Sequence, residues 1–189
     1  MYFTTNPVLG FIPWVREYLG FTFIDPWSFF SNPLTQEGFC LPALFSLWIF
    51  LKYTTKTSWT NWKMLLTVEA VCVLAGWVSL RWGSTGLHIF DLGFIMFPII
   101  AYLRPSIPMA LFYALDFLIG LSGDVWGDIW TFHFQQGWYF GIGGAGFHDS
   151  LFLAPLETLA ACIVLRYGLA FLSRYMRRPF LDEYRNAKR

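Results

Sequence analysis

The sequence predicts an all-α membrane protein, a polytopic bundle of about five transmembrane helices with an N-terminal interfacial helix and a short extracytoplasmic, hairpin-like cap. Three observations lead to this class. Hydrophobic residues make up 56% of the 189 residues and charged residues only 13%, whereas a soluble domain carries roughly 25% charged residues. Aromatic residues reach 21%, an excess typical of chains that meet lipid headgroups. Several segments are apolar over nearly the ~20 residues that a spanning helix needs, so we treat residues 1–189 as one integral membrane domain.

The first apolar segment, residues 7–24, is expected to lie on the membrane surface as an amphipathic helix. It contains Pro13 and the adjacent charged residues Arg16 and Glu17, which suit an interfacial position better than the bilayer interior. A sixth span is the alternative. It would place the N-terminus on the cytoplasmic side and leave the rest of the topology unchanged.

Transmembrane helices are predicted over residues 36–53, 64–82, 86–103, 106–121 and 149–172. The breaks between them carry turn signals. Residues 54–62 are polar, Gly83-Ser84-Thr85 is a tight break, and Arg104-Pro105 ends one helix and begins the next.

Basic residues are distributed unevenly along this topology. Ten of the thirteen Lys and Arg residues fall on the side of the C-terminus, while Arg16 and Arg81 fall on the other side and Arg166 lies within the last helix. Because basic loops stay in the cytoplasm, we expect a cytoplasmic C-terminus in a multi-pass protein of a bacterial inner membrane or an equivalent membrane. The basic tail, residues 173–189, is expected to contact anionic membrane lipids or a cytoplasmic partner, or to serve only as a topology anchor. No nucleic-acid partner is expected, because these basic residues are a topology signal.

The longest connection, residues 122–148, is predicted to form an outer cap. It is rich in aromatic residues and contains no Lys or Arg, and residues 129–134 alternate large apolar with smaller polar side chains, which predicts a short β-hairpin. Its glycine-rich run, residues 141–146, lacks the βαβ context of a dinucleotide-binding motif. We expect this run to let the backbone approach another helix, an ion or a partner closely, or to form a flexible lead-in to the last helix.

Ionisable residues inside apolar helices should face the bundle interior, because a charge at the bilayer centre costs at least ~2.5–3.5 kcal/mol. Asp91, Asp116 and Glu157 lie at similar distances from the outer ends of three predicted helices. His88 shares a helix face with Asp91 at a spacing of three residues. The sequence therefore predicts an outward-facing polar cluster that comprises Arg81, His88, Asp91, Asp116, His148, Asp149 and Glu157.

Two further groups of residues are expected to be structural. Glu69 and Arg166 lie at similar depth on the inner side and are predicted to form an ion pair across helices. Cys40, Cys72 and Cys162 are widely spaced, so we expect buried, inert thiols and neither a disulfide framework nor a metal site.

The outer cluster has three interpretations. It can be a set of helix-to-helix contacts that fix the bundle, a permeation or sensing site in which acids attract a cation or proton, or a metal or acid–base centre acting on a lipid. The sequence contains no HExxH motif, no His-x-x-x-His pair and no other complete catalytic motif, and its spacing identifies no metal or cofactor.

From these observations we expect a non-enzymatic membrane subunit, either a homo-oligomer or a component of a larger membrane complex. It would act as a sensor, channel or assembly component through the outer cluster. The alternative is an integral-membrane enzyme for a lipid or isoprenoid substrate that uses Asp91, Asp116, His148 and Glu157. A transporter is disfavoured, because the sequence has no inverted repeat and no clear pair of broken helices.

Overall fold

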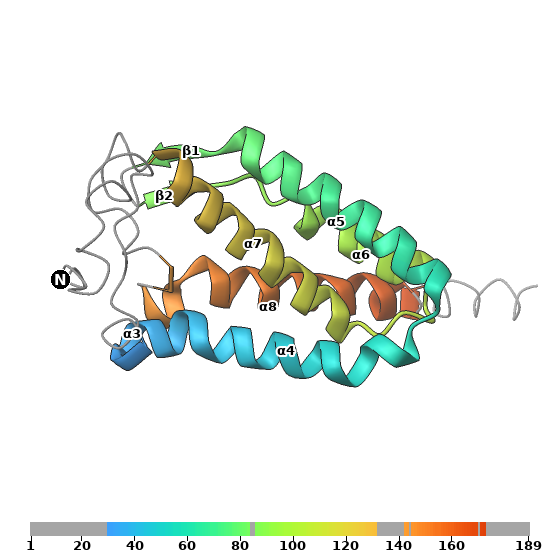
Figure 1. Cartoon of the computed structure of the whole chain (residues 1–189). Coiled ribbons are helices and arrows are strands. Elements are labelled where there is room, and N and C mark those ends of the chain that lie inside the picture. Colours follow the sequence, from blue (N-terminus) through green and yellow to red (C-terminus); the bar gives the residue numbers. More distant parts are fainter. Residues whose placement is uncertain (1–29, 84–85, 132–141, 144, 170, 173–189) are drawn as a thin grey trace, which may run out of the picture.

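The computed structural model describes residues 30–83, 86–131, 142–143, 145–169 and 171–172 (Figure 1). Within this part the secondary structure is almost entirely helical, and four helices are long and apolar enough to cross a membrane. The expectation of an α-helical membrane protein is confirmed at this level. The predicted interfacial helix 7–24 and the basic tail 173–189 lie outside the described residues.

The first long helix is continuous from Pro33 to Lys56 and contains the predicted span 36–53. It consists of α3 (Pro33–Thr35), the π-helix η1 (Gln36–Cys40), α4 (Leu41–Tyr53) and the 3₁₀ turn η2 (Thr54–Lys56). Asn32 caps its start by accepting a hydrogen bond from the backbone N–H of Leu34 (2.9 Å), and Pro33 suits the first helical position because it has no N–H to satisfy.

The second long helix, α5 (Trp59–Ser79), begins five residues before the predicted start at residue 64 and ends three before the predicted end. Ser58 caps it by accepting a hydrogen bond from Asn61 N–H (3.4 Å). A small antiparallel hairpin follows, made of β1 (Arg81–Gly83) and β2 (Gly86–His88), with Arg81 opposite His88. Arg81 therefore lies in a strand and not at the end of a helix as expected.

The prediction of a single helix over residues 86–103 is wrong. The chain leaves β2 in an extended conformation and becomes helical only at α6 (Gly93–Leu103), whose 11 residues cover about 16 Å, roughly half of a bilayer core. The Asp91 carboxylate accepts a hydrogen bond from the backbone N–H of Phe94 (3.3 Å), and the Ser79 hydroxyl accepts one from the N–H of Phe90 (2.7 Å). These side chains accept hydrogen bonds from backbone N–H groups that would bond to backbone carbonyls if the helix began earlier.

The third long helix, α7 (Ala110–Thr131), continues ten residues past the predicted end at residue 121. The predicted hairpin-like cap 122–148 is therefore wrong over residues 122–131, and residues 132–141 lie outside the described residues. Tertiary packing supports the extension. Trp126 stacks on Trp77 of α5 with ring centroids 4.6 Å apart, and the Trp77 indole N–H donates to the Ser122 carbonyl (3.2 Å).

The last long helix comprises α8 (Ser150–Ile163) and the π-helix η5 (Val164–Gly168). It is preceded by the 3₁₀ turn η4 (Gly146–His148) and by two glycines with positive φ, Gly143 (70°) and Gly146 (60°). This glycine-rich stretch packs against Gly38 of η1 so closely that a Cβ on Gly38 would stand 2.5 Å from the Gly143 carbonyl oxygen. Its glycines thus serve close backbone packing, one of the two expected roles.

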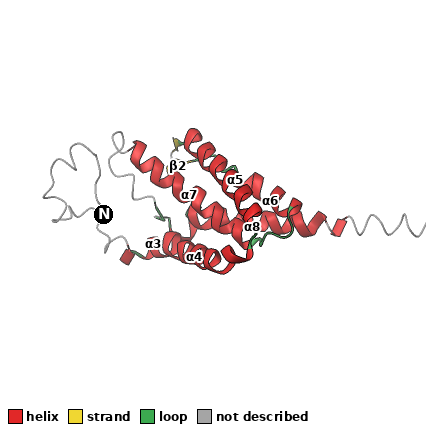
Figure 2. Cartoon of the chain, turned by 45° about the vertical axis from the view of Figure 1, so that its right-hand side comes forward, coloured by secondary structure: helices red, strands yellow, loops and turns green. Residues whose placement is uncertain are grey.

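Helix α7 occupies the centre of the bundle, where it packs against α4, α5 and α8 (Figure 2). Leu111, Phe112, Leu115 and Ile119 on α7 are almost fully buried, and the Phe112 ring packs on Phe97 of α6 with centroids 5.5 Å apart. The outward faces of α4 and α5 instead expose large apolar side chains, as expected where lipid replaces water. We call the end of the bundle that carries β1–β2 and the start of α8 the hairpin end (Figure 1).

Candidate functional site: an acid-lined cavity inside the bundle

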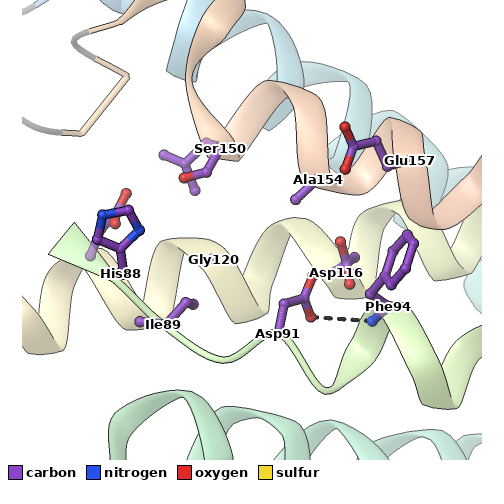
Figure 3. Close-up of a pocket in the computed structure, with 11 residues that line it drawn as sticks. His88, Ile89, Asp91, Phe94, Asp116, Gly120, Ser150, Ala154 and Glu157 are labelled. Atoms are coloured by element: carbon purple, nitrogen blue, oxygen red, sulfur yellow. Dashed lines mark hydrogen bonds between the residues drawn. The ribbon is translucent and has the colours of Figure 1, made fainter. Parts of the chain in front are cut away.

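A cavity of about 330 Å³ lies between α7, α8 and the extended segment that joins β2 to α6 (Figure 3). Its wall is apolar around Ile89, Phe94, Leu151 and Ala154, and the polar side chains in it come from all three elements. These polar side chains are His88, Asp91, Asp116, Asp124, Ser150 and Glu157.

Asp91 enters the cavity from the non-helical segment just before α6. Its Oδ1 accepts the hydrogen bond from Phe94 N–H, so the carboxylate sits at the N-terminus of α6. The partial positive charge of a helix N-terminus favours a negative group at this position. Non-helical backbone at membrane depth is tolerated where it lines a cavity, and Ile89 and Asp91 of this segment line this one.

Asp116 projects from the central helix α7 beside Asp91 (Figure 3). Only 2% of its surface is exposed, and neither carboxylate oxygen accepts a hydrogen bond of good geometry. The hydroxyl of Thr158 on α8, itself fully buried, lies close to Asp116 and is likewise without a well-formed hydrogen bond. An unpaired carboxylate in such a place is costly unless its charge is neutralised.

Because Gly93 has no side chain, the carboxylates of Asp91 and Asp116 can approach each other beside it. A Cβ built on Gly93 would stand 2.5 Å from Asp116 Oδ1 and 3.0 Å from Asp91 Oδ1. Both carboxylates therefore reach the same point at the first residue of α6. The doubly ionised state of two carboxylates this close is unfavourable, and it is relieved when one of them binds a proton or when another cation lies beside the pair.

The structure brings together four of the seven residues of the predicted outer cluster, which are His88, Asp91, Asp116 and Glu157. His88 belongs to β2 and Asp91 to the following segment, so the expected helix face at a spacing of three does not exist. Asp116 also lies deeper than expected. It is six residues from the start of α7 and fifteen from its end, because α7 extends to Thr131.

Three residues of the predicted cluster do not line the cavity. Arg81 and His148 are exposed, in β1 and η4 respectively. Asp149 is the N-cap of α8, where its carboxylate accepts hydrogen bonds from the backbone N–H groups of Leu151 (3.0 Å) and Ala145 (3.3 Å). Burial raises the pKa of Asp149, while these two hydrogen bonds oppose the shift. Its role in the structure is to start a helix.

The predicted ion pair between Glu69 and Arg166 is wrong. The Arg166 guanidinium donates to the backbone carbonyl oxygens of Pro105 and Ile107, in the turn between α6 and α7. Both carboxylate oxygens of Glu69 are buried and have no hydrogen-bond partner. Glu69 instead lies within electrostatic range of Asp116 and Asp91, since α5 packs against α7.

Sequence reasoning missed Asp124 and Ser150 as lining residues, because residue 124 was assigned to the outer loop. Helical spacing would have found both. Asp116, Gly120 and Asp124 repeat every four residues and share one face of α7. Ser150, Ala154 and Glu157, at spacings of four and three residues, share one face of α8.

Among the described residues, no three His, Cys, Asp or Glu side chains converge in a way that could hold a metal ion. Comparison of the chain with family models, with curated proteins and with solved structures finds no match. The function must therefore be inferred from the geometry and chemistry of the cavity. The site offers paired carboxylates in an apolar bundle, a cavity beside them, and further acids and a histidine on the cavity wall.

Proposed function

We propose that the protein is a non-enzymatic, multi-pass membrane subunit that takes up a small cation, the proton included, into the cavity lined by Asp91, Asp116 and Glu157. It acts as a sensor or channel component. One observation carries the proposal. The Asp116 carboxylate is 2% exposed, accepts no hydrogen bond of good geometry, and stands beside Asp91 on the wall of a cavity. A positive ligand would remove the cost of that arrangement, whereas a purely structural role leaves the cost uncompensated.

We propose that the cavity takes up its cation from the extracytoplasmic side. Lys52, Lys56, Lys63 and Arg104 all lie at the end of the bundle opposite the hairpin end, where the α4–α5 and α6–α7 connections run. Basic residues favour the cytoplasmic side, which assigns the hairpin end to the outside and the C-terminus to the cytoplasm of a bacterial inner membrane or an equivalent membrane. In this topology the segment 86–103 makes the third of five passes, partly as extended chain.

Assembly belongs to the same proposal. The exposed apolar faces of α4 and α5 are available to lipids, to a second copy of the chain or to other membrane subunits. The tail 173–189 would contact anionic lipids or a cytoplasmic partner. The lipid-enzyme alternative uses the same acids, so it is an outcome of the experiment below.

The experiment measures thermal unfolding of the purified protein in lipid nanodiscs over a range of pH and with added NaCl, KCl or CaCl₂. We expect the wild-type midpoint to rise with acidification or with one of the cations, and we expect Asp116→Asn to lose this response. Glu37→Gln, which removes an acid outside the cavity, is the matched control and should respond like the wild type. A wild-type midpoint that no condition moves would overturn the proposal. A lipid conversion abolished by Asp116→Asn would favour the enzyme.

A further inference from the structure

We propose that the cation is a proton, which Asp116 carries and donates in a hydrogen bond to an ionised Asp91. This inference rests on the proposed function and deepens it, because it names the ligand and the atoms that hold it. On uptake, a proton that enters the cavity from water forms an O–H bond on the Asp116 carboxylate. One of the two adjacent negative charges is thereby removed.

The two carboxylates differ in their surroundings, and this difference assigns the proton. Asp91 accepts a backbone hydrogen bond at the N-terminus of α6, where helix geometry stabilises an anion. Asp116 is almost fully buried and neither of its oxygens accepts a hydrogen bond of good geometry. In a pair of adjacent acids, the group that lacks donors is the one that keeps the proton. Asp116 then becomes a donor, and Asp91, whose Oδ1 reaches the same point beside Gly93, is its acceptor.

The groups around Asp116 make a proton a better ligand than a metal ion. Titratable groups face Asp116 from each neighbouring element. They are Glu69 and Cys72 of α5, His88 of β2, Asp91 of the segment before α6, and Glu157 and Cys162 of α8. The described His, Cys, Asp and Glu side chains nevertheless include no set of three that could hold a metal ion. A proton needs only one acceptor beside its carrier, and Asp91 provides it.

The test is infrared spectroscopy of the protein in lipid nanodiscs, which detects the C=O stretch of a protonated carboxyl group and its shift in D₂O. We expect this band in the wild type at neutral pH and its loss in Asp116→Asn, an isosteric change. Glu37→Gln should leave the band in place. Asp91→Asn should move the band in frequency without removing it, since an amide oxygen then replaces a carboxylate as the acceptor.

Three outcomes overturn the inference. The first is a carboxyl region that is the same in the wild type and in Asp116→Asn, and the second is a band that Asp91→Asn does not move. The third is a wild type without the band whose unfolding midpoint rises with Na⁺, K⁺ or Ca²⁺, in which case the proposed function survives with a metal cation as ligand. If Asp116→Asn does not fold, titration of the wild-type band to alkaline pH replaces it, and the expected result is loss of one protonated carboxyl group.

Discussion

The carboxylates of Asp91 and Asp116 meet against Gly93, at the point where α6 begins. The two residues come from different elements, an extended segment and the central helix, and both carboxylates occupy the space that a side chain on Gly93 would need. The contact depends on this one residue, and the first prediction tests it.

Gly93→Ala should destabilise the protein by about 1–3 kcal/mol, the usual cost of overpacking. The new Cβ would stand 2.5 Å from Asp116 Oδ1 and 2.7 Å from Ile119 Cδ1, both of which belong to buried residues of α7. Thermal or denaturant unfolding in detergent measures the change. Gly168→Ala is the matched control, because nothing lies within 4 Å of its Cβ position, and it should be neutral or slightly stabilising.

Glu69→Gln and Arg166→Met should have independent effects on stability. Arg166 bonds to the backbone of Pro105 and Ile107, so its loss should cost about 1 kcal/mol, whereas Glu69 has no hydrogen-bond partner to lose. The double variant should equal the sum of the single variants to within about 0.5 kcal/mol. A larger coupling energy would restore the ion pair that the sequence suggested.

Asp149→Ala should destabilise α8 by about 1 kcal/mol through the loss of its N-cap. Asp149→Asn should retain most of the stability, because its amide oxygen can still accept from Leu151 N–H. Hydrogen exchange of the first turn of α8 measures the local effect. Equal protection in the wild type and the alanine variant would show that the cap contributes nothing.

Cysteine labelling tests which side of the membrane the hairpin end faces. In a Cys40→Ala background, Ser150→Cys should react with a membrane-impermeant maleimide added to intact cells, since Ser150 is exposed and lines the cavity. Ser106→Cys, exposed at the opposite end, should react only after the membrane is opened. The remaining Cys72 and Cys162 are buried and should stay silent. The reverse pattern of labelling would invert the topology.

Hydropathy predicted the helices wherever a segment is apolar throughout. The spans 36–53 and 149–172 correspond to long helices because exposed apolar side chains such as Leu47 and Val164 continue their apolar run. Composition over about 20 residues is a reliable signal, since the bilayer imposes the length of a spanning helix.

Hydropathy failed where tertiary contacts decide the secondary structure. Residues 86–103 are apolar enough for a helix, yet the Asp91 side chain and the Ser79 hydroxyl take over backbone hydrogen bonds and delay the helix to Gly93. Residues 122–131 read as a loop, yet the stacking of Trp126 on Trp77 keeps them helical. Trp77 and Trp126 are far apart in the sequence, so a local pattern cannot reveal their contact. The hydrogen bonds from Phe94 N–H to Asp91 and from Phe90 N–H to Ser79 join residues that are only 3 and 11 positions apart, and there the apolar composition of the segment concealed a local helix start.

The candidate site was predictable in its chemistry but not in its geometry. An acid in an apolar helix must turn inward, and this rule alone selected Asp91, Asp116 and Glu157, which do line one cavity. It also selected Glu69, for which the wrong partner was assigned, because depth along a helix does not specify which neighbour a side chain faces.

The non-helical segment before α6 also determines where the bundle can change conformation most easily. Residues 89–92 are held by few hydrogen bonds, among them the one from Phe90 N–H to the Ser79 hydroxyl and a tight turn from Leu92 N–H to the Phe90 carbonyl (3.1 Å). Moving this stretch would break those two hydrogen bonds and the one from Phe94 N–H to Asp91, and it would separate Ile89 from Gly123. Displacing α7 would instead separate it from three packed helices. Gain or loss of charge beside Asp91 would thus act on a hinge of a few residues, with the long helices as its rigid frame.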